Sequence, residues 1–229
     1  MVAAMFPAAG SGRRMGAKKN KVLLSLDGKP ILVHTLRKFS NSPSVDFLVV
    51  IAGENEIDEV GRILEDEADL KPYKIVAGGS ERQYSVENGL KALPDDAEIV
   101  LVHDAARPLV AVDTIEKVIS AVREKGAAIA AVPEKNTVKV VENGIIVDTP
   151  KREKLYAAQT PQGFKRDVLL NAYEKARKDG FLGTDDSSLV ERMGFSVHIV
   201  IDDDKNIKLT TPSDLKMAEA YLEGENRCE

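Results

Sequence analysis

The sequence predicts an α/β protein with a single doubly wound, mostly parallel sheet and helices on both faces. Short continuous apolar runs, typical of strands buried on both faces, recur along the chain. They alternate with amphipathic stretches whose apolar residues recur at helical spacing. A hairpin signal interrupts this alternation once. Because no linker or repeat separates two folding units, we expect residues 1–229 to form one domain.

The expected elements follow one another in the order of a doubly wound sheet. The expected strands cover residues 2–6, 47–51, 73–76, 99–102, 127–132, 155–159 and 197–201. The expected helices run from 31 to about 41 and over 57–64, 84–93, 114–125, 165–178, 186–193 and 212–222. Strands joined by helices run parallel, which gives a sheet with few antiparallel pairs.

The hairpin signal lies at Asn143-Gly144, between the alternating apolar stretches 137–141 and 145–148. Asn-Gly in such a setting is the strongest short-range hairpin signal. An isolated hairpin is barely stable in water unless it packs on something. We therefore expect residues 136–156 to project as a β-arm that packs on another subunit, the alternative being a hairpin lying on its own domain.

Composition excludes several classes of protein. Apolar residues make up 43% and charged residues 30%, as in ordinary soluble globular domains. No apolar run is long enough to span a bilayer and no signal peptide precedes the first strand, so a cytoplasmic location without membrane contact is expected. The single cysteine, Cys228, forms no disulfide framework. A net charge of −5 disfavours nucleic-acid binding, so anionic ligands would need a local cationic cleft.

The first such cleft is predicted directly after the first strand. Small residues come first, namely Ala8, Ala9, Gly10, Ser11 and Gly12. Their backbone N–H groups can form a concavity that binds phosphate. Five cations follow, namely Arg13, Arg14, Lys18, Lys19 and Lys21. The stretch therefore predicts a polyphosphate cradle, the alternative being a solvated surface loop.

Two familiar phosphate motifs do not fit this stretch. The third glycine, Gly16, comes one residue late for a dinucleotide fingerprint, which disfavours a nicotinamide-dependent reductase. No register supplies a Walker loop.

Further polar groups follow other expected strands, where open parallel sheets bind their ligands. After residues 73–76 come Gly79, Ser80, Arg82 and Ser85, which could meet the edge of a base or serve only as a turn and helix cap. After residues 99–102 comes Asp104, whose carboxylate could hold ribose hydroxyls or a Mg²⁺ that bridges phosphates.

Other polar residues have a less direct interpretation. His103, which precedes Asp104, is interpreted as a core residue rather than a base. Lys208, between apolar neighbours, is unusual for a solvated face, whereas the run 202–204 of three acids is interpreted as an exposed loop.

Seven segments together resemble the 2-C-methyl-D-erythritol 4-phosphate cytidylyltransferase family over residues 2–222. They are PAAGSGRRMG, AGGSERQYSV, VHDAARP, NTVKVV, LYAAQTPQGF, the pair Thr184-Asp185, and DKNIKLTTPSDL. The resemblance implies a Rossmann-like nucleotidyltransferase fold and transfer of CMP from CTP to 2-C-methyl-D-erythritol 4-phosphate, with release of pyrophosphate, in the non-mevalonate isoprenoid precursor pathway. It also implies Mg²⁺ as cofactor and a homodimer that exchanges its arms, so that Arg152 acts in its neighbour's site.

The resemblance also assigns roles to residues. Arg14 and Lys21 would stabilise the transition state, and Arg152 and Lys208 would position the methylerythritol phosphate. The CTP site would be lined by Ala8, Ala9, Gly10, Gly79, Ser85, Asp104 and Ala105, and is completed in our prediction by Ser11, Gly12, Ser80 and Arg82. Thr137 and Thr160 would contact the second substrate, to which we add Arg107.

The sequence departs from the family pattern at two positions. The family usually has Pro-Lys-Gln where this chain has Asn20-Lys21-Val22, so the lysine is kept without its rigidifying proline. An acid is common where Ser80 stands. These departures concern local loop geometry and one base contact.

Two other functions fit the same motifs. A ribitol 5-phosphate cytidylyltransferase would use a substrate that differs only by hydroxyls and a methyl group. A non-catalytic nucleotide-binding regulator on the same fold would be expected to lose the cations first, yet Arg14, Lys21, Arg152 and Lys208 are all present.

Overall fold

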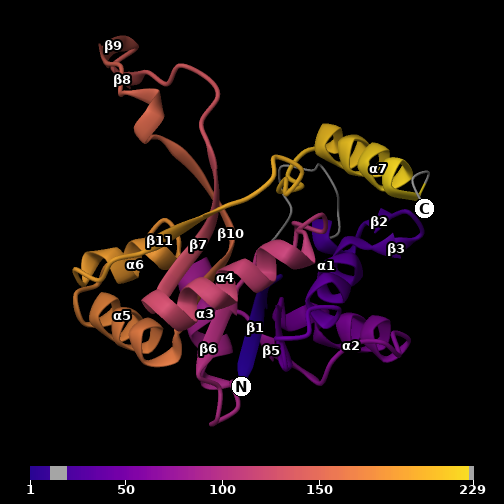
Figure 1. Ribbon diagram of the computed structural model, residues 1–229. Helices are drawn as coiled ribbons and strands as arrows, with labels where there is room; N and C mark the ends of the chain where they lie inside the picture. The colour runs from indigo at the N-terminus through magenta and orange to yellow at the C-terminus, as the bar shows by residue number, and fades with distance from the viewer. Residues whose placement is uncertain (11–19, 227–229) are drawn as a thin grey trace.

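The computed structural model describes residues 1–10 and 20–226, and a seven-stranded sheet forms its centre in the strand order β11-β7-β10-β6-β1-β4-β5 (Figure 1). The strands of this sheet are β1 (Val2–Pro7), β4 (Phe47–Ala52), β5 (Tyr73–Ala77), β6 (Ile99–Val102), β7 (Ala127–Pro133), β10 (Tyr156–Lys165) and β11 (His198–Ile201). Only β10 runs antiparallel to its neighbours, so the predicted mostly parallel sheet is confirmed.

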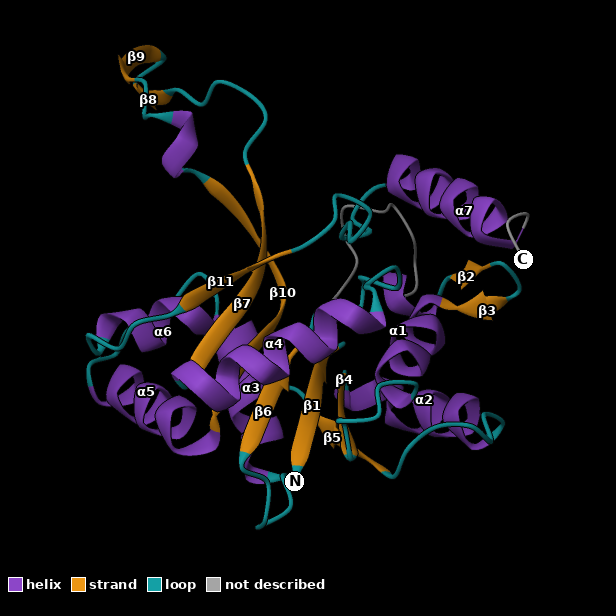
Figure 2. Ribbon diagram, in the orientation of Figure 1, coloured by secondary structure: helices purple, strands orange, loops and turns teal. Residues whose placement is uncertain are grey.

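Helices cover both faces of this sheet, as the alternation of apolar stretches predicts (Figure 2). On one face pack α1 (Ile31–Ser40), α2 (Ile57–Glu65) and α4 (Val112–Lys125). On the other face pack α3 (Arg82–Lys91), α5 (Arg166–Lys178) and α6 (Asp186–Arg192). Side chains alternate along a strand, so successive residues of β1 pack in different cores. Ala4 and Phe6 belong to the core on one face, and Ala3 and Met5 belong to the core on the other face.

A third, smaller core lies beside the sheet. The short strands β2 (Ser25–Leu26) and β3 (Lys29–Pro30) pair there, and the last helix α7 (Pro212–Asn226) packs against β2. Its buried residues are Leu26, Ile31, Leu109, Leu209 and Ala218. Because Leu209 belongs to this core, the chain beside it, including Lys208, is held against the end of the sheet.

The hairpin of β8 (Val140–Glu142) and β9 (Ile145–Asp148) projects away from this body at the end of a long extension of β7 and β10 (Figure 1). A single 3-10 turn, η4 (Arg152–Lys154), lies between β9 and β10. The apolar side chains of the hairpin are exposed, Ile145 to 68% and Ile146 to 58%. Such a patch far from its own core is the kind of surface that another chain covers.

Most expected elements are confirmed to within two residues at their ends, but the expected strand 155–159 is wrong at its end. It continues as β10 to Lys165, and residues 162–165 pair antiparallel with β6. The register between β10 and β7 shifts between Ala158 and Gln162. Thr160-Pro161 and Gly163 suggest the end of a strand, yet the Gln162–Lys165 segment still pairs with β6 on one side and with β7 on the other.

Candidate active site

A cavity of about 740 Å³ opens at the carboxyl ends of β1, β5 and β6. Its lining comes from the segments after these strands and from the chain before α7. The lining residues are Pro7, Ala8, Ala9, Gly10, Asn20, Lys21, Val22, Gly79, Ser80, Glu81, Arg82, Ser85, Asp104, Ala105, Ala106, Lys208 and Thr210. This is the end of an open parallel sheet at which ligands bind.

A second cavity of about 720 Å³ lies at the opposite end of β6, next to Ile99 and the start of α5. Arg123 and Arg166 line it together with Asp95 and Asp167, so both signs of charge are present. It contains none of the residues that the sequence predicts for the site. The first cavity is therefore the candidate active site.

Asp104 is the electrostatic centre of that cavity. Its Oδ2 atom accepts hydrogen bonds from Lys208 Nζ at 2.9 Å and from Arg107 Nε at 3.2 Å. Burial raises the pKa of this carboxyl, but the nearby charges of Lys208, Arg107 and Arg82 outweigh burial and hold its pKa well below the usual range. Asp104 is thus ionised at neutral pH and orients two cations.

Lys21 contacts the segment that carries Lys208. It begins the 3-10 turn η2 (Lys21–Leu23), and its Nζ atom donates to the Leu209 carbonyl at 2.9 Å. The neighbouring backbone is itself fixed, since Leu209 N donates to the Ala106 carbonyl at 2.8 Å. Lys21 and Lys208, 187 positions apart in sequence, therefore converge on one wall of the cavity.

Arg82 is held at the rim by a fully buried carboxylate. Its Nη2 atom lies 2.6 Å from Asp186 Oδ2, and Tyr173 Oη donates to Asp186 Oδ1 at 2.5 Å. Burial lowers the pKa of Arg82, but the charge of Asp186 raises this pKa by more than burial lowers it. The guanidinium therefore stays charged. Burial and the same carboxylate raise the pKa of the Tyr173 phenol, which keeps its proton as a donor.

The glycine turn after β5 packs closely against the loop after β1. A Cβ atom on Gly78 would come within 2.5 Å of Ala9 Cβ, so only glycine lets the two loops approach. Ser85 Oγ accepts from Gly79 N at 2.9 Å and donates to the Glu81 carbonyl at 3.0 Å. Ser85 thus joins the glycine turn to the start of α3, but the N-cap of this helix is Glu81, which makes no side-chain capping bond, so only the turn part of the alternative interpretation holds. Gly79 and Ser85 also line the cavity.

His103 is buried completely and organises the loop that carries Asp104. Its Nε2 atom lies 3.1 Å from the Arg107 carbonyl, which can only accept, so Nε2 carries the proton. Its Nδ1 atom accepts from Thr160 Oγ1 at 3.0 Å, and the same hydroxyl accepts from Asp104 N at 3.1 Å. Burial lowers the pKa of His103 to about 3, so the imidazole is neutral and structural, as the sequence predicts.

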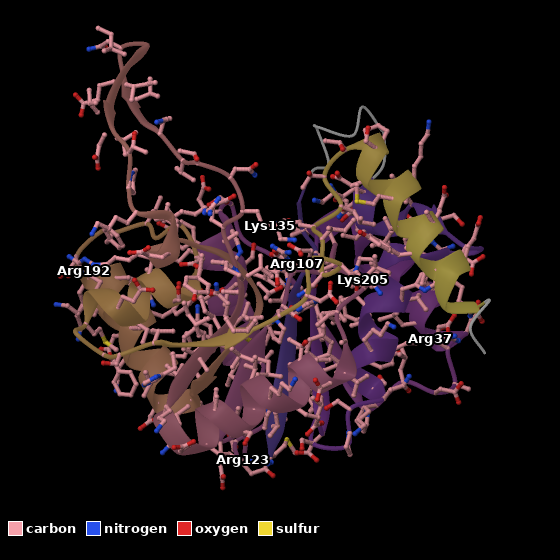
Figure 3. The ribbon with its side chains drawn as sticks, turned by 45° about the horizontal axis from the view of Figure 1, so that its top comes forward. Arg37, Arg107, Arg123, Lys135, Arg192 and Lys205 are labelled. Carbon is pink, nitrogen blue, oxygen red and sulfur yellow. The ribbon has the colours of Figure 1, made fainter. Side chains whose placement is uncertain are left out.

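The structure brings together most, but not all, of the site residues predicted from sequence. Arg107 and Thr160 do not line the cavity; Arg107 bonds to the Asp104 carboxylate, and Thr160 accepts from the Asp104 backbone N–H. Figure 3 shows Arg107 near the centre of the molecule, whereas Arg37, Arg123 and Arg192 lie at its outline. Ser11, Gly12 and Arg14 lie outside the described residues.

Thr137 and Arg152 are exposed residues of the arm and do not line the cavity of their own chain. Arg152 Nη1 donates to the Lys135 carbonyl at 3.0 Å. Lys135 in turn pairs with Asp204 at the base of the arm. The two arm residues therefore lie on a segment separate from the cavity in this chain.

Six residues that line the cavity have no place among the predicted site residues: Pro7, Asn20, Val22, Glu81, Ala106 and Thr210. All but Thr210 are neighbours in sequence of predicted residues. The sequence marks Asn20 only as a departure from the family pattern. Only 4% of Asn20 is exposed, which is unusual for asparagine and is not indicated by the sequence.

The comparisons with known proteins agree with this geometry. A family model described as 2-C-methyl-D-erythritol 4-phosphate cytidylyltransferase matches residues 2–224. The chain belongs to the 2-C-methyl-D-erythritol 4-phosphate cytidylyltransferase family. A family enzyme from Geotalea uraniireducens is 47% identical over 228 residues, which cover 98% of each chain. One from Bacillus licheniformis is 47% identical over 225 residues, covering 98% of this chain and 97% of the relative.

Solved structures of this cytidylyltransferase family share the fold. The 4-diphosphocytidyl-2C-methyl-D-erythritol synthase of Anaerococcus prevotii superposes with a TM-score of 0.87 at 34% identity, covering 97% of this chain and 96% of that one. The cytidylyltransferase of Thermus thermophilus superposes with a TM-score of 0.80 at 29% identity, covering 96% of this chain and 98% of that one. None of the described helices has the length and apolar character needed to cross a membrane.

Proposed function

We propose that this protein transfers CMP from CTP to 2-C-methyl-D-erythritol 4-phosphate, forming 4-diphosphocytidyl-2-C-methyl-D-erythritol and pyrophosphate. Membership of the family supports this activity, which belongs to isoprenoid precursor synthesis. One observation of the structure carries it: Lys21, Lys208 and ionised Asp104 meet in a cavity at the carboxyl end of the sheet. Two anionic substrates require such a local concentration of positive charge.

The reaction needs charge neutralisation more than proton transfer. The attacking oxygen of the polyol phosphate is already ionised, so it forms its bond to the α-phosphorus of CTP as the bond to pyrophosphate breaks. Two unit charges of like sign near 4 Å repel by about 4 kcal/mol at an effective dielectric constant of 20. Preorganised cations offset this repulsion most strongly where charge develops in the transition state.

The described residues divide this work among them. Lys21 and Lys208 both line the cavity, and we propose that Lys21 meets the triphosphate and Lys208 the phosphate of the second substrate. Asp104 pairs with Lys208, which lines the cavity, and with Arg107, which does not, so the Lys208 cation is oriented before substrate arrives. The small residues Ala8, Ala9 and Gly79 let the nucleotide approach the backbone. Neutral His103 holds the loop and takes no proton from substrate.

We propose that Mg²⁺ binds with the triphosphate of CTP and with Asp104 as its protein carboxylate. Among the described residues no three His, Cys, Asp or Glu side chains gather as a metal site. Mg²⁺ commonly keeps its waters and binds through one or two carboxylates and substrate phosphates. Asp104 Oδ1, which accepts no hydrogen bond from a described residue, fits as that carboxylate or as an acceptor for a ribose hydroxyl. Bound there, the ion would neutralise phosphate charge.

The proposal also includes a homodimer joined through the arm. The exposed apolar side chains of β8 and β9 support it, since their own chain leaves them in solvent. A second copy of the chain that binds the arm would also contact Thr137 and Arg152, which do not line the cavity of their own chain. Substitution of Ile145 and Ile146 by Asp should shift the mass in solution from dimer to monomer, whereas a monomeric wild type would contradict the proposal.

The activity is tested by offering CTP with each polyol phosphate separately. Pyrophosphate release with 2-C-methyl-D-erythritol 4-phosphate, and much less with ribitol 5-phosphate, is the expected result. A preference for ribitol 5-phosphate would assign the alternative substrate. Binding of CTP without release of pyrophosphate from either pair would indicate a regulator. Chelation of Mg²⁺ should abolish release, and its re-addition should restore it.

A further inference from the structure

Asn20 is buried between the end of β1 and the turn that carries Lys21. Its side chain makes three hydrogen bonds. Nδ2 donates to the Ala8 carbonyl at 2.5 Å and to Glu56 Oε2 at 2.8 Å, and Oδ1 accepts from Val22 N at 3.3 Å. One amide therefore joins the loop after β1, the start of η2, and the 3-10 turn η3 (Glu54–Glu56) before α2.

The orientation of this amide is fixed by the chemistry of its partners. A backbone carbonyl and a carboxylate only accept hydrogen bonds, so the NH₂ group must face Ala8 and Glu56. The backbone N–H of Val22 only donates, so the oxygen must face η2. Neither aspartate nor a flipped amide satisfies the same three partners.

The backbone at Asn20 has a conformation that also suits proline. Its φ is −57° and its ψ is 129°, and proline fixes φ near −65°. Its own N–H donates no hydrogen bond to any described residue. The turn therefore has the geometry that a rigid ring would impose, but here side-chain hydrogen bonds supply the restraint.

What this restraint holds is the direction of Lys21. Asn20 caps η2, whose first residue is Lys21, and the Lys21 ammonium donates to the Leu209 carbonyl in the cavity wall. A rotation of η2 about its cap would move that ammonium out of the cavity wall. We propose that Asn20 is a positioning residue that acts through Lys21, its side-chain bonds to Ala8, Glu56 and Val22 doing what a rigid backbone would otherwise do. The inference rests on the proposed function, in which Lys21 stabilises the transferred phosphate.

A double-mutant cycle tests whether Asn20 acts through Lys21. Lys21→Ala should lower kcat about 10²-fold or more, as loss of one preorganised donor does. Asn20→Ala should lower kcat about 10- to 100-fold with little change in either KM, because the cation is misplaced rather than absent. In the Lys21→Ala background, Asn20→Ala should add almost nothing. Asn41→Ala, at an exposed helix end, is the matched control and should leave kcat unchanged.

Two further substitutions separate positioning from general loss of structure. Asn20→Pro should recover most of the kcat lost in Asn20→Ala, because it restores the fixed φ without the amide. Asn20→Asp has nearly the same shape, yet it should be at least as impaired as Asn20→Ala, because its oxygen would face a carbonyl and a carboxylate. Thermal unfolding of each variant gives the fraction of protein that is folded under the assay conditions, so that each kcat can be expressed per folded molecule.

Several outcomes would overturn the inference while leaving the proposed function intact. Full kcat in Asn20→Ala, equal impairment in Asn20→Pro and Asn20→Ala at similar thermal stability, or independent effects of the Asn20 and Lys21 substitutions would each do so. A wild-type protein that releases no pyrophosphate from CTP would instead remove the proposed function itself.

Discussion

His103 is proposed to take no part in the reaction, yet its burial makes the stability of the fold depend on pH. Its folded pKa of about 3 lies below the ordinary value of 6.5, because burial disfavours the imidazolium. Asp104 and Arg107 also act on it, with opposite signs. Since the unfolded chain binds the proton more readily, stability present above pH 6.5 is lost as the pH falls toward 3.

We therefore predict that the free energy of unfolding falls by roughly 2–3 kcal/mol between pH 6.5 and 4.5 through this residue. The carboxylates with lowered pKa, such as Asp104 and Glu67, have ordinary values of 3.8 and 4.5 and act mainly below this window. Urea unfolding across the window measures the slope. His103→Gln should flatten it, and an unchanged slope would show that other groups carry the dependence.

The hydrogen bond between Tyr173 and Asp186 leads to a second prediction, which concerns stability and the KM for CTP. Tyr173→Phe removes a donor from a carboxylate that has no exposure, so it should cost about 1–3 kcal/mol of stability. Because Asp186 holds Arg82 at the cavity rim, the KM for CTP should rise more than the KM for the polyol phosphate. Tyr73→Phe, whose hydroxyl bonds to no described residue, is the control. Equal changes in both KM values would argue against a nucleotide contact for Arg82.

At the scale of residues, the sequence predicts the reactive groups better than the residues that hold them in place. Asp104, Gly79 and Ala8 could be expected in the cavity because each follows a recognisable strand. The partners that hold them could not. Arg82 and Asp186 are 104 positions apart, and no spacing rule predicts such a pair. The role of Asn20 was likewise hidden, because an asparagine before a lysine is by itself an ordinary loop residue.

At the scale of elements, β10 is where the sequence pattern and the structure disagree. Parallel strands here are continuous apolar runs and were predicted closely, whereas the Gln162–Lys165 segment of β10 mixes polar, glycine and aromatic residues. The glycine in this segment is explained by its close packing against α4. A Cβ atom there would come within 2.8 Å of both Val118 and Val122 and within 2.9 Å of Leu101.

We predict opposite stability changes for two Gly→Ala substitutions in different elements. Gly163→Ala should destabilise the fold by about 1–3 kcal/mol, because the two β-branched valines cannot rotate away without moving α4. Gly61→Ala, in α2, meets only Ile75 Cδ1 at 3.9 Å and should stabilise by up to about 1 kcal/mol. Thermal unfolding of both variants measures this. A neutral Gly163→Ala would mean that α4 moves away from β10 more easily than its packing indicates.

On the scale of the whole molecule, the separation of the arm from the cavity gives the sharpest prediction. Lys208 lines the cavity of its own chain, while Arg152 lies on the projecting arm, so in the proposed dimer each site combines residues of two chains. Homodimers of Arg152→Ala and of Lys208→Ala should each be weakly active. Co-expression of the two variants should restore activity, because one site of every mixed dimer contains neither substitution, and random assortment then gives about a quarter of the wild-type rate. Separately tagged subunits allow the mixed dimer to be purified and measured at about half the wild-type rate per dimer. Mixed dimers no more active than the parents would place Arg152 in the site of its own chain or outside the site altogether, and would leave the cavity complete within one subunit.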